Sequence, residues 1–187
     1  MNNTVFREAF LAVGLVSLLL GAMFVSTGTF PPMVVVESGS MMHDDDGKIG
    51  VIDPGDLVLV INPERKDIIT YVEATDPNNE NFGYRSHGMH GDVIVFSKNG
   101  GSDTPVIHRA LLKSVENESG GWDVPGTTLR GVGSINWTLE YSCVSYHGSA
   151  YDLKITDWVP SHEGYLTTGD NEDTNGRSFL TYLAWQN

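Results

Sequence analysis

The sequence holds a single cysteine, Cys143, among 187 residues. One cysteine excludes an intramolecular disulfide framework and any all-cysteine zinc site. Basic residues are also scarce, with 11 Lys and Arg against 24 Asp and Glu and a formal net charge of −13. Because binding to a phosphate backbone needs clustered Lys and Arg, nucleic acid is not an expected partner. The apolar fraction of 40% excludes a disordered chain.

Charge of either sign is absent from residues 9–36, and the densest apolar run covers residues 9–25. A membrane span needs roughly 20 apolar residues, and a pair of prolines, Pro31 and Pro32, then stops a helix. This pattern predicts a membrane anchor over residues 1–30 and one domain over residues 31–187. A cleaved signal peptide, whose apolar region is typically ~7–15 residues, and a buried core helix are the alternatives.

The charges on either side of the apolar run predict its orientation. Arg7 precedes the run and Glu8 is the only acid before it, so 23 of the 24 acids follow it. The positive-inside rule then places the N-terminus in the cytoplasm and the domain outside, as a single-pass protein of the cell membrane in contact with membrane lipid. The acidic excess fits either ordinary solubility or adaptation to high salt.

Helical periodicity is nearly absent after the anchor. Short β-rich runs are instead bounded by Gly, Pro, Asn and Asp. The pattern predicts a mostly β, antiparallel domain in which residues 112–163 form a motif-poor insertion. The expected strands are 33–36, 57–61, 68–72, 93–96, 106–107, 110–112, 137–139, 153–155 and 165–167.

A Ser-Gly-Ser tripeptide, Ser38 to Ser40, follows the first expected strand. Serine is a weak nucleophile unless a base lies beside it. Gly39 permits a sharp turn, and a backbone N–H at such a turn can stabilise an oxyanion. The tripeptide alone is more typical of a loop, so a catalytic interpretation depends on a partner base.

His108 is the strongest candidate base because it lies within a β-rich run, residues 105–111, where its neighbours would pack around it. A buried structural histidine is the alternative for this position. His87 and His90 lie in a Gly-rich stretch, but no third ligand for a metal ion is evident near them.

Two carboxylates, Asp170 and Asp173, lie in a polar loop after the last expected strand, and either could orient a histidine. A calcium loop is the alternative, since Asn171-x-Asp173-x-Asn175-Gly176 is similar to the start of an EF-hand. Its twelfth position is Tyr182, which cannot supply the bidentate carboxylate. We therefore expect neither a metal nor another cofactor.

Taken in order, six segments resemble those of type I signal peptidases of the archaeal and endoplasmic-reticulum type. The resemblance extends over residues 9–171 and lapses across the insertion and after Asn171. The segments are the apolar span, Ser-Gly-Ser-Met at 38–41, Pro-Gly-Asp-Leu-Val at 54–58, Gly-Asp-Val-Ile-Val-Phe at 91–96, Val-Ile-His-Arg at 106–109 and Gly-Asp-Asn at 169–171.

The resemblance implies a role for each matching residue. Ser40 is the nucleophile, and His108 stands where bacterial relatives carry a lysine, so the chain is similar to the serine–histidine branch. The Ser38 hydroxyl matches a position that completes the oxyanion hole in the bacterial branch. Asp170 matches the aspartate of Gly-Asp-Asn.

One position departs from the family pattern. The archaeal and reticulum enzymes carry a second aspartate five or six residues after the first, where this chain has Asn175 and Gly176. Asp173 is the nearest substitute, so both Asp170 and Asp173 are candidates for the carboxylate that orients His108.

The resemblance implies a membrane-bound serine endopeptidase that removes N-terminal signal peptides from exported preproteins, with the secretion machinery as a further candidate partner. Activity should fall as the pH drops through the pKa of a catalytic histidine, ordinarily about 6.5. Two alternatives stay open. One is a catalytically impaired or non-catalytic anchored β domain that binds a partner, and the other is a related protease for regulatory or pilin-like substrates.

Overall fold

The computed structural model describes residues 3–44, 47–97, 104–141, 151–171 and 182–184. The chain divides into two compact units, which we describe separately. The first comprises residues 1–35 and 55–67, and the second comprises residues 36–54 and 68–187.

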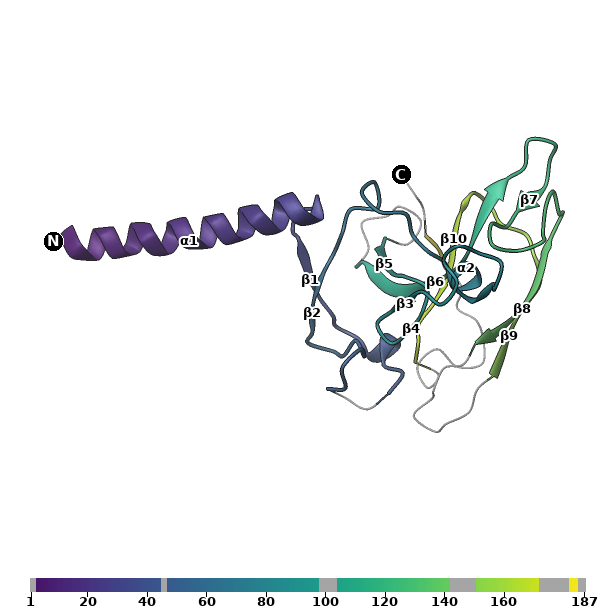
Figure 1. The fold of residues 1–187 in the computed structure, drawn as a ribbon, viewed down its shortest axis with the longest axis horizontal. Coiled ribbons are helices and arrows are strands. Elements are labelled where there is room, and N and C mark those ends of the chain that lie inside the picture. The colour runs from purple at the N-terminus through teal and green to yellow at the C-terminus, as the bar shows by residue number, and fades with distance from the viewer. Residues whose placement is uncertain (1–2, 45–46, 98–103, 142–150, 172–181, 185–187) are drawn as a thin grey trace. The chain divides into compact units, whose positions relative to one another are not determined.

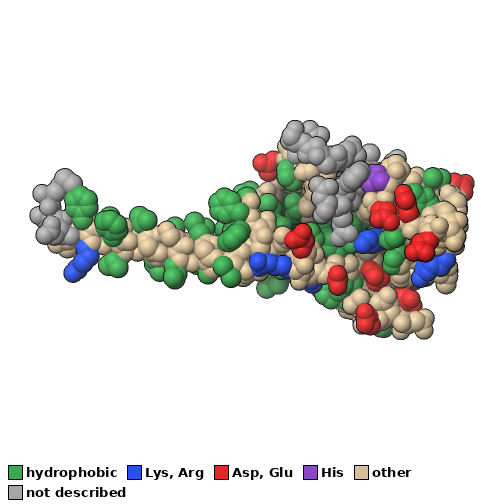
Figure 2. Space-filling view, turned by 90° about the horizontal axis from the view of Figure 1, so that it is seen from above, with side chains coloured by type: hydrophobic (Ala, Val, Ile, Leu, Met, Phe, Trp, Pro, Cys, Tyr) green, Lys and Arg blue, Asp and Glu red, His purple; other side chains and the backbone are tan. Residues whose placement is uncertain are grey.

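The first unit begins with an apolar helix, α1 (Asn3–Thr27). Hydrophobic side chains cover its surface along its length (Figure 2). Its mean hydropathy reaches 2.3, and by length and composition it could cross a membrane. At its end, the Gly28 N–H donates to the Phe24 carbonyl and the Asn62 N–H donates to the Thr27 carbonyl, each at 2.8 Å.

A short hairpin completes this unit. Strands β1 (Met33–Val35) and β2 (Leu57–Leu59) pair antiparallel, with Met33 opposite Leu59 and Val35 opposite Leu57. Directly opposed residues share a face of the ladder. On this face Val35, Leu57 and Leu59 are each at least 60% exposed, so the hairpin presents an apolar surface.

The second unit is built on an antiparallel sheet with the strand order β11-β10-β6-β5, of which Figure 1 labels β5, β6 and β10. The long central strand β6 also pairs with β7 near its far end. The strands are β5 (Val93–Phe96), β6 (Val106–Glu116), β7 (Trp122–Asp123), β10 (Gly164–Thr168) and β11 (Tyr182–Ala184).

Shorter elements surround the sheet. The hairpin of β3 and β4 closes through the two-residue turn His87-Gly88, where φ is +49° and +77°. Such left-handed pairs match the twist of hairpin strands. The remaining elements are η1 (Gly39–Met41), α2 (Tyr71–Thr75), β3 (Arg85–Ser86), β4 (Met89–His90) and the paired strands β8 (Ile135–Tyr141) and β9 (Tyr151–Trp158).

Buried side chains pack on both faces of the sheet. Successive residues of a strand point to opposite faces. Leu166 belongs to the larger cluster, together with Leu111 and Leu112, whereas the preceding Tyr165 belongs to a smaller one with Phe96 and Ala110. Strand β6, which carries the candidate base His108, thus lies between two packed layers.

The structure confirms the β-rich, antiparallel character of the chain and the single apolar helix near its N-terminus. The strand at 93–96 is found as expected, and the runs 106–107 and 110–112 are parts of one strand. The expected strand at 68–72 is wrong: residues 68–70 form no strand, and the Thr70 hydroxyl and the Glu73 carboxylate form a capping box that starts α2 at Tyr71. Segment 112–163, expected as motif-poor, contains β7, β8 and β9.

Candidate active site

The two serines lie at the start of η1. Ser38 is extended and exposed, and its Oγ lies 3.2 Å from the Oγ of half-buried Ser40. The next residue, Met41, is fully buried and fixes the turn in the core. One hydroxyl therefore contacts the other on a surface that a substrate can reach.

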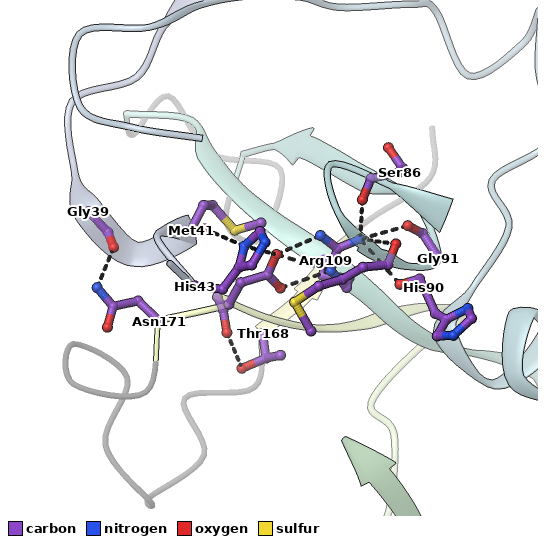
Figure 3. Close-up of polar contacts among 12 residues, drawn as sticks. Gly39, Met41, His43, Ser86, His90, Gly91, Arg109, Thr168 and Asn171 are labelled. Atoms are coloured by element: carbon purple, nitrogen blue, oxygen red, sulfur yellow. Dashed lines mark hydrogen bonds and ion pairs between the residues drawn. The ribbon is translucent and has the colours of Figure 1, made fainter. Parts of the chain in front are cut away.

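The segment after β10 docks on this turn. The Asn171 backbone N–H donates to the Ser40 carbonyl at 2.9 Å, and its side-chain Nδ2 donates to the Gly39 carbonyl at 2.7 Å (Figure 3). A side chain at Gly39 would place its Cβ 3.1 Å from the sulfur of Met42. Gly39 thus serves close packing around the turn.

Asp170, which precedes Asn171, forms a buried ion pair with Arg109. Nε of Arg109 donates to Oδ1 at 2.8 Å, and Nη2 donates to Oδ2 at 2.6 Å. Both side chains are at most 1% exposed. A buried bidentate pair of this kind fixes the geometry of both partners.

The same guanidinium reaches the β3–β4 hairpin. Its Nη1 donates to the carbonyls of Ser86 at 3.0 Å and Gly91 at 2.7 Å, with His90 also in range (Figure 3). A Cβ at Gly91 would lie 2.7 Å from the backbone nitrogen of Tyr71. Only glycine fits there, which gives the Gly-Asp segment at 91–92 a packing role.

His108 lies on the central strand β6 and is 5% exposed. Its Nδ1 lies 3.3 Å from the hydroxyl oxygen of Thr167 on β10. The Phe96 ring packs edge-on against the imidazole, with a centroid distance of 6.2 Å. A polar contact at Nδ1 and an aromatic neighbour on β5 therefore help to hold the imidazole.

A second histidine lies beside the Asp170 carboxylate. His43 is 9% exposed, and its Nδ1 lies 3.8 Å from Oδ2 of Asp170 and 3.4 Å from the Met41 carbonyl. In the nearby hairpin turn, desolvation lowers the pKa of His87, and the charge of Arg109 lowers this pKa further. Two histidines therefore lie close to the ion pair.

Ser38, Ser40, His108 and Asp170 all belong to the second unit. Asn171 links Asp170 to the serine turn, and η1 packs against β6, the strand of His108. Asp173, the other candidate carboxylate, lies outside the described residues, as do Asn175 and Gly176 of the calcium-loop alternative.

The sequence patterns predict no role for Arg109, Asn171 or Thr167. A lone arginine within the apolar run 105–111 was an available signal, since such a charge needs a buried carboxylate partner. In the part of the chain that the structure describes, no three His, Cys, Asp or Glu side chains gather as a metal site.

No protein-family model matches the chain, and neither a curated protein nor a solved structure matches it.

Proposed function

We propose that the chain is a membrane-anchored serine endopeptidase of the signal peptidase I type, which removes signal peptides from exported preproteins. One observation carries the proposal. The segments at 38–41, 91–92, 106–109 and 169–171, far apart in sequence, are joined by hydrogen bonds through Arg109, Asp170 and Asn171. These are four of the six segments on which the sequence resemblance rests, and Asn171 joins them to the serine turn.

The chemistry follows from the roles of the two residues. His108 takes the proton of Ser40 as its oxygen attacks the scissile carbonyl carbon. The oxyanion is held by the Ser40 N–H and the Ser38 hydroxyl, whose oxygen lies 3.2 Å from the nucleophile. His108 then gives the proton to the leaving amine as the C–N bond breaks, and it activates the water that releases the acyl group.

The first unit supports the proposed place at the membrane. Helix α1 is exposed along its apolar length and leads directly into the β1–β2 hairpin, whose apolar face is also exposed. Ser40 follows Thr27 by 13 residues, which reach at most about 45 Å when extended. A nucleophile on this tether stays close to the point where a substrate's signal peptide leaves the bilayer, on the outer side if the N-terminus is cytoplasmic.

The test is cleavage of a preprotein by the full chain in detergent or nanodiscs. We expect the wild type to release the signal peptide, and Ser40→Ala and His108→Ala to lose this activity while they stay folded. Ser119→Ala and His162→Gln, which change residues outside the site, serve as matched controls and should retain it. Each variant is assayed at low and at high salt, because the net charge is −13.

A fluorophosphonate probe gives a readout that needs no substrate. An activated serine displaces fluoride from phosphorus and keeps the probe as a covalent ester, so wild type should be labelled at Ser40 and His108→Ala should not. A folded wild type that neither cleaves nor reacts with the probe at any salt contradicts the proposal. An anchored β domain that binds a partner would then be the better interpretation.

A further inference from the structure

We infer that Thr167 is the positioning residue that orients the His108 imidazole, an inference that rests on the proposed peptidase function. Its hydroxyl oxygen lies 3.3 Å from His108 Nδ1, and both residues are buried. In this assignment Nδ1–H donates to the Thr167 oxygen. Nε2 is then the unprotonated nitrogen that accepts the Ser40 proton, which is the task a carboxylate performs in a Ser-His-Asp triad.

A β-bulge creates this contact. Along β6 and β10 the register runs from Tyr165 opposite Lys113 to Leu166 opposite Leu112, then shifts so that Thr167 lies opposite Ala110. Leu111 is thus an extra residue on β6. In an unbroken ladder Thr167 would oppose Leu111 and share a face with Arg109, because side chains alternate along a strand.

The shift moves Thr167 to the face of the sheet that Ala110 and His108 use. Arg109 points to the other face, where it binds Asp170. The bulge therefore gives the two adjacent residues of β6 separate partners: a hydroxyl for the imidazole and a carboxylate for the guanidinium. Bulges occur beside active sites because they re-aim side chains in this way.

The surroundings favour an orienting hydroxyl. Thr167 is 0% exposed and lies opposite the fully buried Ala110, so its buried surroundings restrict its rotamer. A neutral hydroxyl lets the imidazole gain and lose its proton at Nε2 without a second buried charge. It also stabilises the imidazolium through the Nδ1–H bond, which would raise the pH at which the base becomes protonated.

The experiment replaces the hydroxyl with a methyl group. In the full chain, Thr167→Val should lower kcat by about 10- to 100-fold, a part of what general acid–base catalysis contributes, with little change in KM. The acid limb of the pH–rate profile should move to lower pH. Thr167→Ser restores the hydroxyl and should recover most of kcat. Thr138→Val, at an exposed threonine on β8, is the matched control and should behave as wild type.

A second readout is independent of activity. In a histidine-labelled sample, ¹⁵N chemical shifts report which ring nitrogen of His108 carries the proton, with His108→Gln to assign the signals. Wild type should show the Nδ1–H form, and Thr167→Val should show a mixture. A Thr167→Val variant with unchanged kcat, pH profile and ring signals overturns the inference, as does an activity that depends on Asp173 alone.

The two failures can be told apart. If wild type cleaves but Thr167→Val cleaves equally well, the peptidase function stands and the positioning role falls. If wild type is inert, the peptidase function falls, and the ring signals then decide whether Thr167 sets the His108 tautomer.

Discussion

Arg109 holds both carboxylate oxygens of Asp170 while its other nitrogen donates to the carbonyls of Ser86 and Gly91. One buried guanidinium thus ties the β3–β4 hairpin to the segment that follows β10. Because Asn171 is the next residue and binds the Gly39 and Ser40 backbone, the ion pair sets where the serine turn lies. We assign Asp170 a structural role through Arg109, and loss of activity in an Asp170 variant need not mean that Asp170 orients a histidine.

The first prediction concerns the stability that this pair provides. Asp170→Ala should lower the free energy of unfolding by about 3–5 kcal/mol, because it leaves a buried guanidinium without its counter-charge. Thermal unfolding of the full chain in detergent, followed by circular dichroism, measures the change. Asp152→Ala, which removes an exposed carboxylate on β9, is the control and should shift the transition little.

Coupling between the partners separates an ion pair from two independent effects. The double variant Arg109→Met/Asp170→Leu should lose less stability than the sum of the two single changes, since neither charge is then left buried alone. Strictly additive losses would count against the pair as the source of the effect.

Substitution of Asn171 should impair catalysis with only a small loss of stability. Asn171→Ala removes the 2.7 Å bond to the Gly39 carbonyl but keeps the backbone bond to Ser40. A net loss of about 1 kcal/mol in stability is expected for one hydrogen bond. We expect kcat to fall about tenfold, which a 1.4 kcal/mol rise in the barrier would produce, because the serine turn is held less rigidly.

The control for this variant is Asn136→Ala, an exposed asparagine whose side chain contacts Asp157. It should lose a similar amount of stability, because Asn136 Oδ1 accepts from the Asp157 N–H at 2.8 Å, but leave kcat close to wild type. A variant at Asn171 that melts much earlier and loses kcat in proportion to its unfolded fraction would show a role in folding alone.

The sequence predicted the strands and the candidate residues better than it predicted their partners. Short β-rich runs predict the strands at 93–96 and 165–167, and the uncharged run at 9–36 predicts α1. Two local effects override the apolar pattern. The Thr70 capping box turns an apolar run into a helix, and the extra Leu111 changes which residue faces Thr167. The Thr-x-x-Glu spacing at 70–73 is a sequence signature of a helix start, whereas the register shift at Leu111 is not encoded in residue spacing.

The assignment of Asp170 illustrates the same limit in the site. The polar loop predicts a carboxylate near the histidine, but the choice between an imidazole and a guanidinium depends on the face to which each side chain of β6 points. Arg109 and His108 are adjacent in sequence, so spacing cannot separate their partners. In the structure Asp170 binds Arg109, and the Thr167 hydroxyl lies beside His108.

His87 yields a prediction for pH dependence. Desolvation, with the Arg109 charge as the next cause, lowers the pKa of His87 below its usual value of 6.5 in the folded chain. The unfolded chain then binds more protons as the pH falls below this value, so folding stability decreases until the folded pKa is passed. His87→Asn should remove this decrease and suits the left-handed backbone at φ +49°.

The measurement is the melting temperature of wild type and His87→Asn between pH 8 and pH 5. At pH 8 residue 87 is neutral in both proteins. The difference between their melting temperatures at this pH is therefore the part that does not depend on protonation. The melting temperature of the variant should rise relative to that of the wild type as the pH falls through about 6.5. The difference between them should then stay constant at lower pH. A difference that stays constant over the whole range would contradict the prediction.

The exposed face of the β1–β2 hairpin yields a prediction about lipid contact. A single cysteine is placed at Leu57, Leu59 or Val58 of a Cys143→Ser chain and labelled with a polarity-sensitive fluorophore. In nanodiscs, labels at Leu57 and Leu59, which are 64% and 60% exposed, should emit at shorter wavelength than the same labels on the unfolded chain without detergent. Spin-labelled lipid should also quench them. Val58 pairs with Val34 on the other face and should be quenched less.

This alternation is the decisive feature, because a strand that lies against lipid by one face must show a period of two. Uniform quenching at all three positions would mean that the hairpin is immersed, and no quenching at any of them would mean that it stays in water. Either result contradicts the prediction, and only the second would leave α1 as the sole membrane contact of the first unit. A period of two would place the apolar face of the hairpin at the bilayer surface.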